Sequence, residues 1–174
     1  ICIANCSSQI LIMTMISQGI YSAQSAYKFQ FITYQQDLTF RANWKAQALP
    51  KQRFFGWLVL HKRALTAENL LIRHWECDWI CPLCISAFED TEHLSRECDF
   101  TRWTWHLVAA AQNIQGTINQ TSLAQWMMDL AHGSNRTESR RRVGILIKTW
   151  WHIWLQRNAK IFRNQEPNSS RVAQ

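Results

Sequence analysis

Apolar side chains recur three or four residues apart along most of the chain after residue 50, which is the period of an amphipathic helix. The pattern predicts helices over residues 51–61, 66–75, 103–116, 121–133 and 137–162. Thr66 and Thr121 stand where a hydroxyl group can cap a helix, and Gly116 and Gly133 stand where a helix can end.

Each predicted helix should turn one apolar side towards a core. In four of them these sides are expected to carry Phe54, Trp57, Leu58 and His61; Trp103, His106, Leu107 and Ala110; Leu123, Trp126, Met127 and Leu130; and Ile147, Trp150, Trp151, Trp154 and Ile161. Tryptophan supplies a large, rigid area for burial, so the tryptophans of the last helix are expected to belong to the core.

The N-terminal part has a different pattern. The apolar run over residues 10–16 predicts a short strand, and Ser22 can cap a helix through Phe31. Five glycines and three prolines are too few for the many tight turns of an all-β sandwich. The predicted fold class is therefore mainly α: a small helical domain organised around one structural zinc knuckle, with a short N-terminal strand.

The apolar run is too short to cross a membrane and lacks the charged leader of a signal peptide. We therefore expect no membrane partner and no secretion, and a reducing compartment in which clustered thiols bind metal. The chain opens on Ile1 without an initiator methionine, and we expect it to be a fragment of a longer product.

The formal net charge of +7 is unevenly placed. Residues 136–163 hold eight basic side chains against Glu138 alone, and residues 41–73 hold seven against Glu68. Between residues 76 and 99 the sign reverses, with seven acidic side chains against Arg96. Basic flanks around an acidic centre indicate a polyanionic partner that meets the flanks.

Four metal-binding side chains fall within residues 81–98, with the spacing C-x2-C-x8-H-x4-C. They are Cys81, Cys84, His93 and Cys98. Together they are a complete tetrahedral set for one zinc ion, with no position left for water, so the site should be structural. We expect Asp90 or Thr91 to cap a single helical turn that carries His93, with Cys98 just past that turn.

Other interpretations of these cysteines stay open. The cluster could be a coincidence of reduced thiols and a surface histidine, a disulfide could form, or Cys77 could replace one ligand. Cys2 and Cys6 are interpreted as incidental. The acidic surroundings would repel phosphate, so the metal is expected to join two basic helical regions without touching nucleic acid.

Four stretches carry a resemblance to a known family: "GIYSAQSAY" (19–27), "ALPKQRFFGWLVLHKRALTAENLLIRHW" (48–75), "CPLC" with "EHL" and the last cysteine (81–98), and "WWHIWLQRNAKIF" (150–162). In this order they resemble the zinc-binding domain that follows the reverse transcriptase domain in plant non-LTR (LINE-type) retrotransposons. The resemblance implies zinc on the same four side chains, a polymerase domain upstream, a ribonuclease H-like domain downstream, and an intracellular protein of the nucleus.

The residue pattern and the resemblance together predict a division of the chain. Residues 1–18 match poorly, residues 19–133 form the zinc-binding domain with its knuckle at 81–98, residues 134–163 form a basic Trp-rich helix, and residues 164–174 form a frayed polar tail.

The chain lacks the residue patterns of a catalytic site. It has no Asp-Asp pair for a two-metal polymerase centre, no Gly-rich phosphate loop and no serine elbow. Glu89 and Asp90 are interpreted as solvated loop carboxylates. We therefore expect a non-catalytic module.

The basic Trp-rich helix suggests a functional surface. Its candidate residues for binding RNA or single-stranded DNA are Arg140, Arg141, Arg142, Lys148, Arg157, Lys160 and Arg163. The tryptophans between them are expected to belong to the core. Two functions follow: a nucleic-acid-binding aid to target-primed reverse transcription, or a connector that docks the polymerase against the next domain.

Overall fold

The computed structural model describes residues 38–114, 122–132 and 135–173. The predicted strand over residues 10–16, the helix after Ser22, and Gly116, Thr121 and Gly133 lie outside the described residues. The chain divides into two compact units, Ile1–Phe40 and Arg41–Gln174. The knuckle and the basic helix both lie in the second unit.

The described part of the chain is helical, which confirms the predicted fold class. Its elements are α4 (Leu38–Lys45), α5 (Pro50–Leu60), α6 (Ala67–Ile72), the π-helical turn η1 (His93–Glu97), α7 (Asp99–Ala111), α8 (Leu123–Ala131), α9 (Arg136–Arg163) and α10 (Ser169–Ala173). Extended structure among the described residues is limited to an isolated antiparallel bridge between Ile80 and Phe88. No helix in these residues is long and apolar enough to span a membrane.

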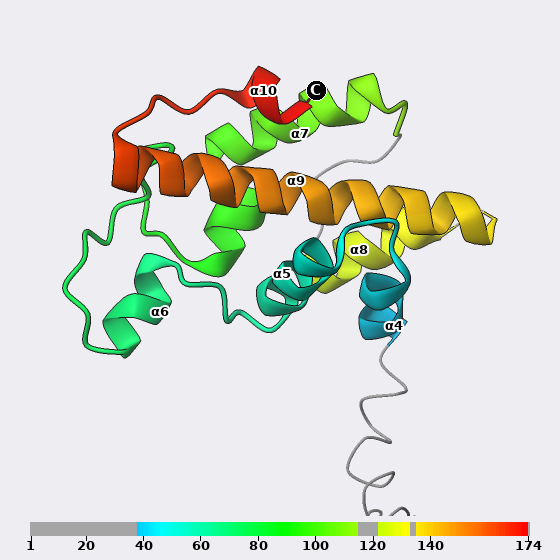
Figure 1. Ribbon diagram of the computed structural model, residues 1–174, viewed down its shortest axis with the longest axis horizontal. Helices are drawn as coiled ribbons and strands as arrows, with labels where there is room; N and C mark the ends of the chain where they lie inside the picture. The colour runs from blue at the N-terminus through cyan, green and yellow to red at the C-terminus, as the bar shows by residue number, and fades with distance from the viewer. Residues whose placement is uncertain (1–37, 115–121, 133–134, 174) are drawn as a thin grey trace, which may run out of the picture. The chain divides into compact units, whose positions relative to one another are not determined.

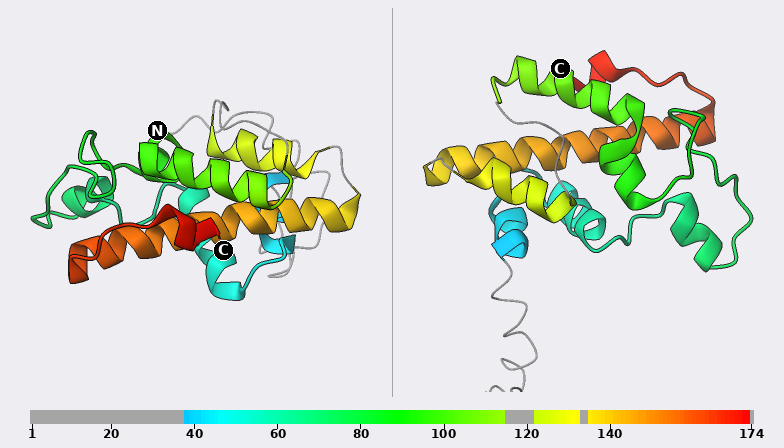
Figure 2. Two further views of the ribbon diagram at one scale, coloured as in Figure 1. Left: turned by 90° about the horizontal axis from the view of Figure 1, so that it is seen from above. Right: turned by 180° about the vertical axis from the view of Figure 1, so that it is seen from behind.

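Helix α9 packs against α5, α7, α8, α10 and η1. Helices α7 and α10 lie along one side of it and α5 and α8 along the other (Figure 1), and the view from behind shows the same division (Figure 2). Asn135 caps α9 by accepting a hydrogen bond from Glu138 N at 2.9 Å, and Asn164 ends it in the left-handed conformation. Ser122, one residue after the expected Thr121, caps α8 in the same way.

Tryptophans from three helices meet in the core beside the first half of α9. Trp105 of α7 meets Trp126 of α8 edge to face at 4.9 Å between ring centroids, and Trp126 meets Trp150 of α9 at 6.0 Å. All three side chains are buried. The backbone of α9 also lies close to the segment between α4 and α5, because a Cβ added at Gly144 would lie 2.5 Å from Gln47 O.

Two predicted helices bury a different side from the expected one. In α5 the buried residues include Phe55 and Val59, whereas Phe54 is 53% exposed. In α7 Trp105 is buried, whereas Trp103 is 60% exposed. Aromatic residues one or two positions apart offer two apolar stripes on one helix, and the tertiary partners decide which stripe is buried.

The ends of two segments also differ from expectation. Helix α6 ends at Ile72 and not at Trp75, because His74 adopts a left-handed φ of 60° and Trp75 N donates to Leu70 O at 3.0 Å. The expectation of a frayed tail after residue 163 is wrong for Ser169–Ala173. These residues form α10, which packs on α7.

Candidate metal centre

A short hairpin holds the turn that carries Cys81 and Cys84. Its backbone bonds run from Cys81 N to Ala87 O at 2.8 Å and from Glu89 N to Trp79 O at 2.9 Å. Inside the hairpin, Ile85 N donates to Cys81 O at 2.8 Å. Backbone hydrogen bonds therefore hold the turn in place at the residues that carry the two thiols.

His93 and Cys98 come from the next turn of helix. Asp90 Oδ1 accepts a hydrogen bond from His93 N at 2.6 Å, which confirms the predicted cap. The turn η1 is π-helical, and Cys98 N donates to His93 O at 2.8 Å. An α-helix would place residues five apart on different sides, whereas the wider π turn keeps them close. Cys98 follows the turn directly, as expected.

The four side chains meet in one cluster. Sγ of Cys81 lies 3.9 Å from Sγ of Cys98, Sγ of Cys84 lies 3.3 Å from Nε2 of His93, and all four ligand atoms are within 4.8 Å of one another. Tetrahedral zinc, with Zn–S near 2.3 Å and Zn–N near 2.0 Å, separates two sulfurs by about 3.8 Å and sulfur from nitrogen by about 3.5 Å. The cluster fits one zinc ion.

Hydrogen bonds within the cluster shift the pKa values of its members. The hydrogen bond with Cys98, together with burial, raises the pKa of Cys81 to about 12, and the same bond lowers the pKa of Cys98. The hydrogen bond with Cys81 raises the pKa of His93 to about 9. A zinc ion takes the place of the protons shared in such a cluster, so metal binding is coupled to proton release.

A buried ion pair joins the cysteine hairpin to α9. Nη2 of Arg157 lies 2.6 Å from Oε1 of Glu89, and Nε contacts both carboxylate oxygens at 3.1–3.2 Å. The side chains are 6% and 1% exposed. Oε1 of Glu89 also accepts a hydrogen bond from Ala67 N at 2.9 Å, at the start of α6 where Thr66 makes no side-chain cap.

The interpretation of Glu89 as a solvated loop carboxylate is therefore wrong. Sequence reasoning missed the pair because 68 residues separate its members. One signal was available, since Arg157 stands four residues after Ile153 and seven after Trp150, on the apolar stripe of the helix. A charged residue on such a stripe requires a partner, because burying an unpaired charge is costly.

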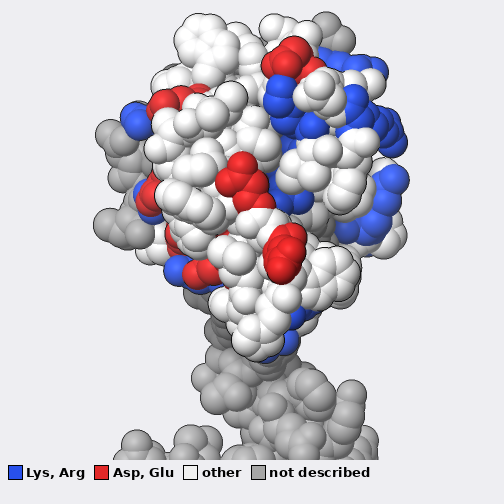
Figure 3. Space-filling model, turned by 90° about the vertical axis from the view of Figure 1, so that its left-hand side faces the viewer, with Lys and Arg blue, Asp and Glu red and all other residues white. Residues whose placement is uncertain are grey.

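Other acids around the knuckle are also neutralised locally. Glu92 and Glu97 both pair with Arg96, at 3.5 and 2.6 Å. Glu76 and Asp78, in contrast, are exposed, and no ion pair of theirs occurs among the described residues. Figure 3 shows acidic side chains across the middle of this end of the molecule and basic ones gathered towards one edge.

The seven basic residues proposed from the sequence lie in different environments. Arg157 is buried; Arg141 and Arg142 pair with Glu138 at 2.7 and 2.9 Å; Lys160 pairs with Glu166 at 2.6 Å; Arg140 is partly buried; Lys148 and Arg163 are exposed. The structure thus brings most of them to the surface of α9 and takes Arg157 into the interior.

Cys77 lies outside the cluster of four. Its Sγ is 3.8 Å from Ala67 O, and the group that could hold a metal comprises the other four side chains. Cys2 and Cys6 lie outside the described residues.

Residues 21–105 match the model of a protein family described as zinc-binding in reverse transcriptase. All four clustered side chains fall inside this match. The resemblance inferred from the sequence is confirmed at the level of this family, and the match does not extend to a plant or LINE-type origin. No curated protein and no solved structure matches the chain.

Proposed function

Starting from the match of residues 21–105 to the reverse transcriptase zinc-binding family, we propose that this chain is an accessory module of a LINE-type retrotransposon polyprotein. It holds one structural zinc ion on Cys81, Cys84, His93 and Cys98. The observation that carries the proposal is the cluster of four protein ligands, which leaves no open coordination position for chemistry. Its proposed role is to assist target-primed reverse transcription, and the resemblance to LINE-type elements implies a site of action in the nucleus.

The module is non-catalytic. Magnesium-dependent polymerases and nucleases need free carboxylates that hold two ions. The adjacent acids Glu89 and Asp90 are committed to other partners, namely the Arg157 side chain and the His93 backbone. The polymerase activity of the polyprotein belongs to the domain upstream.

The surface of α9 supports weak binding of RNA or single-stranded DNA. Lys148, His152 and Arg163 are all exposed, and their spacing of four and eleven residues places them along one side of the helix. Lys51 of α5 lies next to this side, 5.6 Å from the ring of Trp151. Trp150 is buried and Trp151 is partly buried, so contacts with phosphate should dominate the binding and make it independent of sequence.

A salt titration of RNA binding tests this function. Each phosphate contact contributes a slope of about −0.7 to the log–log salt dependence on a single strand. The Lys148→Ala and Arg163→Ala double variant should weaken binding to all sequences alike and flatten the slope. Lys62→Ala is the matched control, because Lys62 is 64% exposed but faces Glu92 at 3.3 Å beside the knuckle.

Two results would count against nucleic-acid binding by α9. One is the absence of binding at low salt by a folded, zinc-loaded chain. The other is an equal loss of affinity in the Lys62→Ala control, which would show that any removed charge has the same effect.

A second function is supported by exposed apolar side chains near the knuckle and the end of α9. Trp75, Ile85 and Phe162 are 66%, 74% and 77% exposed, and a patch of this kind is typical of a protein contact. We propose that it docks the adjacent polymerase domain, and the ribonuclease H-like domain where one follows. Binding of the upstream polymerase domain should slow backbone hydrogen exchange at the residues of this patch. An unchanged exchange pattern would count against docking.

A further inference from the structure

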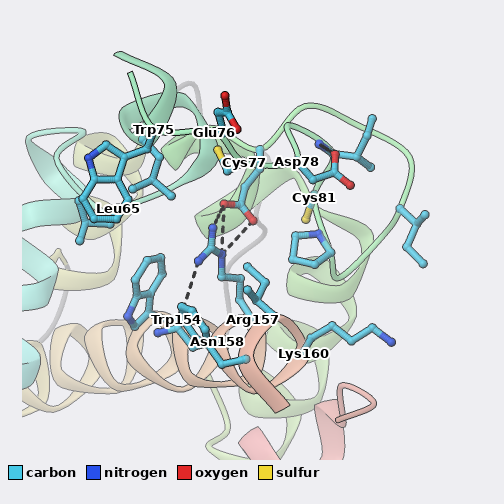
Figure 4. Close-up of a pocket in the computed structure, with 17 residues that line it drawn as sticks. Leu65, Trp75, Glu76, Cys77, Asp78, Cys81, Trp154, Arg157, Asn158 and Lys160 are labelled. Atoms are coloured by element: carbon cyan, nitrogen blue, oxygen red, sulfur yellow. Dashed lines mark hydrogen bonds and ion pairs between the residues drawn. The ribbon is translucent and has the colours of Figure 1, made fainter. Parts of the chain in front are cut away.

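A groove of 810 Å³ opens beside the zinc cluster (Figure 4). One wall comes from the end of α6 and the segment that follows it, another from the cysteine hairpin, and the floor from the second half of α9. Cys81 and Pro82 line the groove. The shape of the groove therefore depends on the turn that carries Cys81 and Cys84, two of the four candidate zinc ligands.

The lining is mostly apolar and includes aromatic residues. Leu65, Trp75, Ile80, Ile161 and Phe162 contribute to it. Trp75 and Phe162 are more than half exposed, so they offer large apolar area that the described residues leave uncovered. Single exposed apolar residues are ordinary on a protein surface, whereas several around one groove mark a binding site.

The basic residues that line the groove are paired with carboxylates, whereas two of its acidic residues are not ion-paired with any described residue. On the floor, Arg157 is neutralised by Glu89, and Lys160 pairs with Glu166. Figure 4 shows Glu76 and Asp78 on the side opposite α9, around the rim. Both are exposed, and neither forms an ion pair within the described part of the chain. The groove thus presents apolar walls and a negatively charged edge.

From these features we infer that the groove binds an amphipathic helix of a partner protein, whose apolar side enters it and whose lysine or arginine side chains face Glu76 and Asp78. Helices that insert apolar anchors into such grooves are a common mode of recognition. The negative edge disfavours nucleic acid, because phosphates would meet uncompensated carboxylates. The inference rests on the docking function proposed above and specifies its partner.

Binding of two synthetic helical peptides to the full zinc-loaded chain tests the inference. Both carry leucines at positions i, i+3, i+4 and i+7, one with flanking lysines and the other with flanking glutamates. Calorimetry should show the basic peptide binding about tenfold more tightly than the acidic one. The double variant Glu76→Gln, Asp78→Asn should remove this preference while both peptides still bind.

Two tryptophans provide a matched pair of variants. Trp75→Ala should weaken the basic peptide about tenfold, as for an anchor residue at an interface centre. Trp79 is similarly exposed but does not line the groove, so Trp79→Ala should leave the affinity within about twofold.

Several results would overturn the inference. They are equal affinity for the two peptides, no binding of either, an equal effect of the two tryptophan variants, or displacement of the basic peptide by an RNA oligonucleotide. Self-association of the chain that disappears in Trp75→Ala would assign the groove to a second copy. If the peptides fail while the polymerase domain still binds, the docking function stands and the groove is not its site.

Discussion

The two halves of α9 are held in place by different forces. Val143, Leu146, Ile147 and Trp150 are buried in a large apolar cluster with residues of α5, α7 and α8. The second half contacts a much smaller cluster, whose buried members are Cys81, Leu94, Cys98 and Ile153. Two of those four side chains belong to the candidate zinc cluster.

The difference shows what a segment needs when it has little apolar area to bury. Beside the first half of α9, tryptophans from three helices supply burial, which is the main favourable term in folding. Beside the second half, the hairpin and η1 depend on coordination and on the Glu89–Arg157 ion pair. Two hydrogen bonds among those of the described residues link the regions: Nε1 of Trp150 donates to Ser95 O at 3.1 Å, and Oγ1 of Thr101 in α7 donates to Leu94 O at 2.7 Å. Trp154 packs against both apolar clusters.

Loss of zinc should have the largest effect, and it should be confined to the knuckle. We expect Cys84→Ser to reduce the zinc content from one ion per chain to nearly none, because a structural zinc site contributes about 10–16 kcal/mol of binding free energy in peptides. Hydrogen exchange should accelerate over residues 66–98 and remain slow in α8 and the first half of α9. Metal analysis and exchange mass spectrometry measure both outcomes.

Cys77→Ser is the control for the zinc experiment. Cys77 lies outside the cluster, so this variant should keep its zinc and its exchange pattern. Loss of metal in Cys77→Ser, or retention of metal in Cys84→Ser, would show that the ligand set is wrong.

A core tryptophan should produce the next largest effect, and it should be global. Trp126→Ala removes a side chain that is 2% exposed and meets two other tryptophans. We expect the free energy of unfolding to fall by about 3–5 kcal/mol. Trp103→Ala, at a site that is 60% exposed, should change it by less than about 0.5 kcal/mol. Urea unfolding of the zinc-loaded chain measures both, and equal losses would contradict the assigned face of α7.

Breaking the ion pair should destabilise the knuckle by a similar or smaller amount. Glu89→Ala leaves the guanidinium of Arg157 buried without its carboxylate, which typically costs about 3–5 kcal/mol. The lower part of this range is expected, because both residues line the groove and water can reach the orphaned charge. Local unfolding free energies from hydrogen exchange in α6 and the hairpin measure the effect.

Two variants separate the ion pair from a general effect of charge. The double variant Glu89→Leu, Arg157→Met should recover much of the lost stability, since an apolar pair of similar size needs no partner. Lys160→Met, which breaks an exposed pair with Glu166, should cost about 1 kcal/mol or less. A double variant no better than Glu89→Ala would show that the carboxylate acts through Ala67 N and not through Arg157.

The parts of the fold that depend on local sequence could be predicted. The metal cluster was predictable because its four members fall within eighteen residues, and Asp90 could be recognised as a cap. The helices α8 and α9 were predictable because their apolar stripes are single and long. The cap of α8 was displaced by one residue, from Thr121 to Ser122, which is within the usual uncertainty of helix ends.

The parts that depend on distant partners could not be predicted. Phe54 and Phe55 are both compatible with the buried side of α5, and only contact with Trp151 and Trp154 selects Phe55. Glu89 could not be paired with Arg157 across 68 residues. The five residues of α10 have no helical signal of their own, because a helix this short is stable only through packing.

The smallest effect is expected at the surface network that begins α9. Hydrogen bonds from Arg141 and Arg142 lower the pKa of Glu138 from 4.5 to about 2. Because the folded-state pKa lies below the unfolded value, the carboxylate stabilises the fold above pH 4.5, and this contribution is lost as the pH falls towards 2. Glu138→Gln should therefore lower the melting temperature slightly at pH 7, with a difference that shrinks between pH 4.5 and 2. Acid releases zinc from the wild-type chain and from the variant alike, so the difference in melting temperature between them still reports Glu138.

At pH 7 the variant should keep its full zinc content, since Glu138 lies in the half of the helix held by the tryptophan core. A difference in melting temperature that is unchanged at pH 2 would show that the charge of Glu138 is not its cause. Any loss of zinc at pH 7 would show that the two halves of α9 are not held independently.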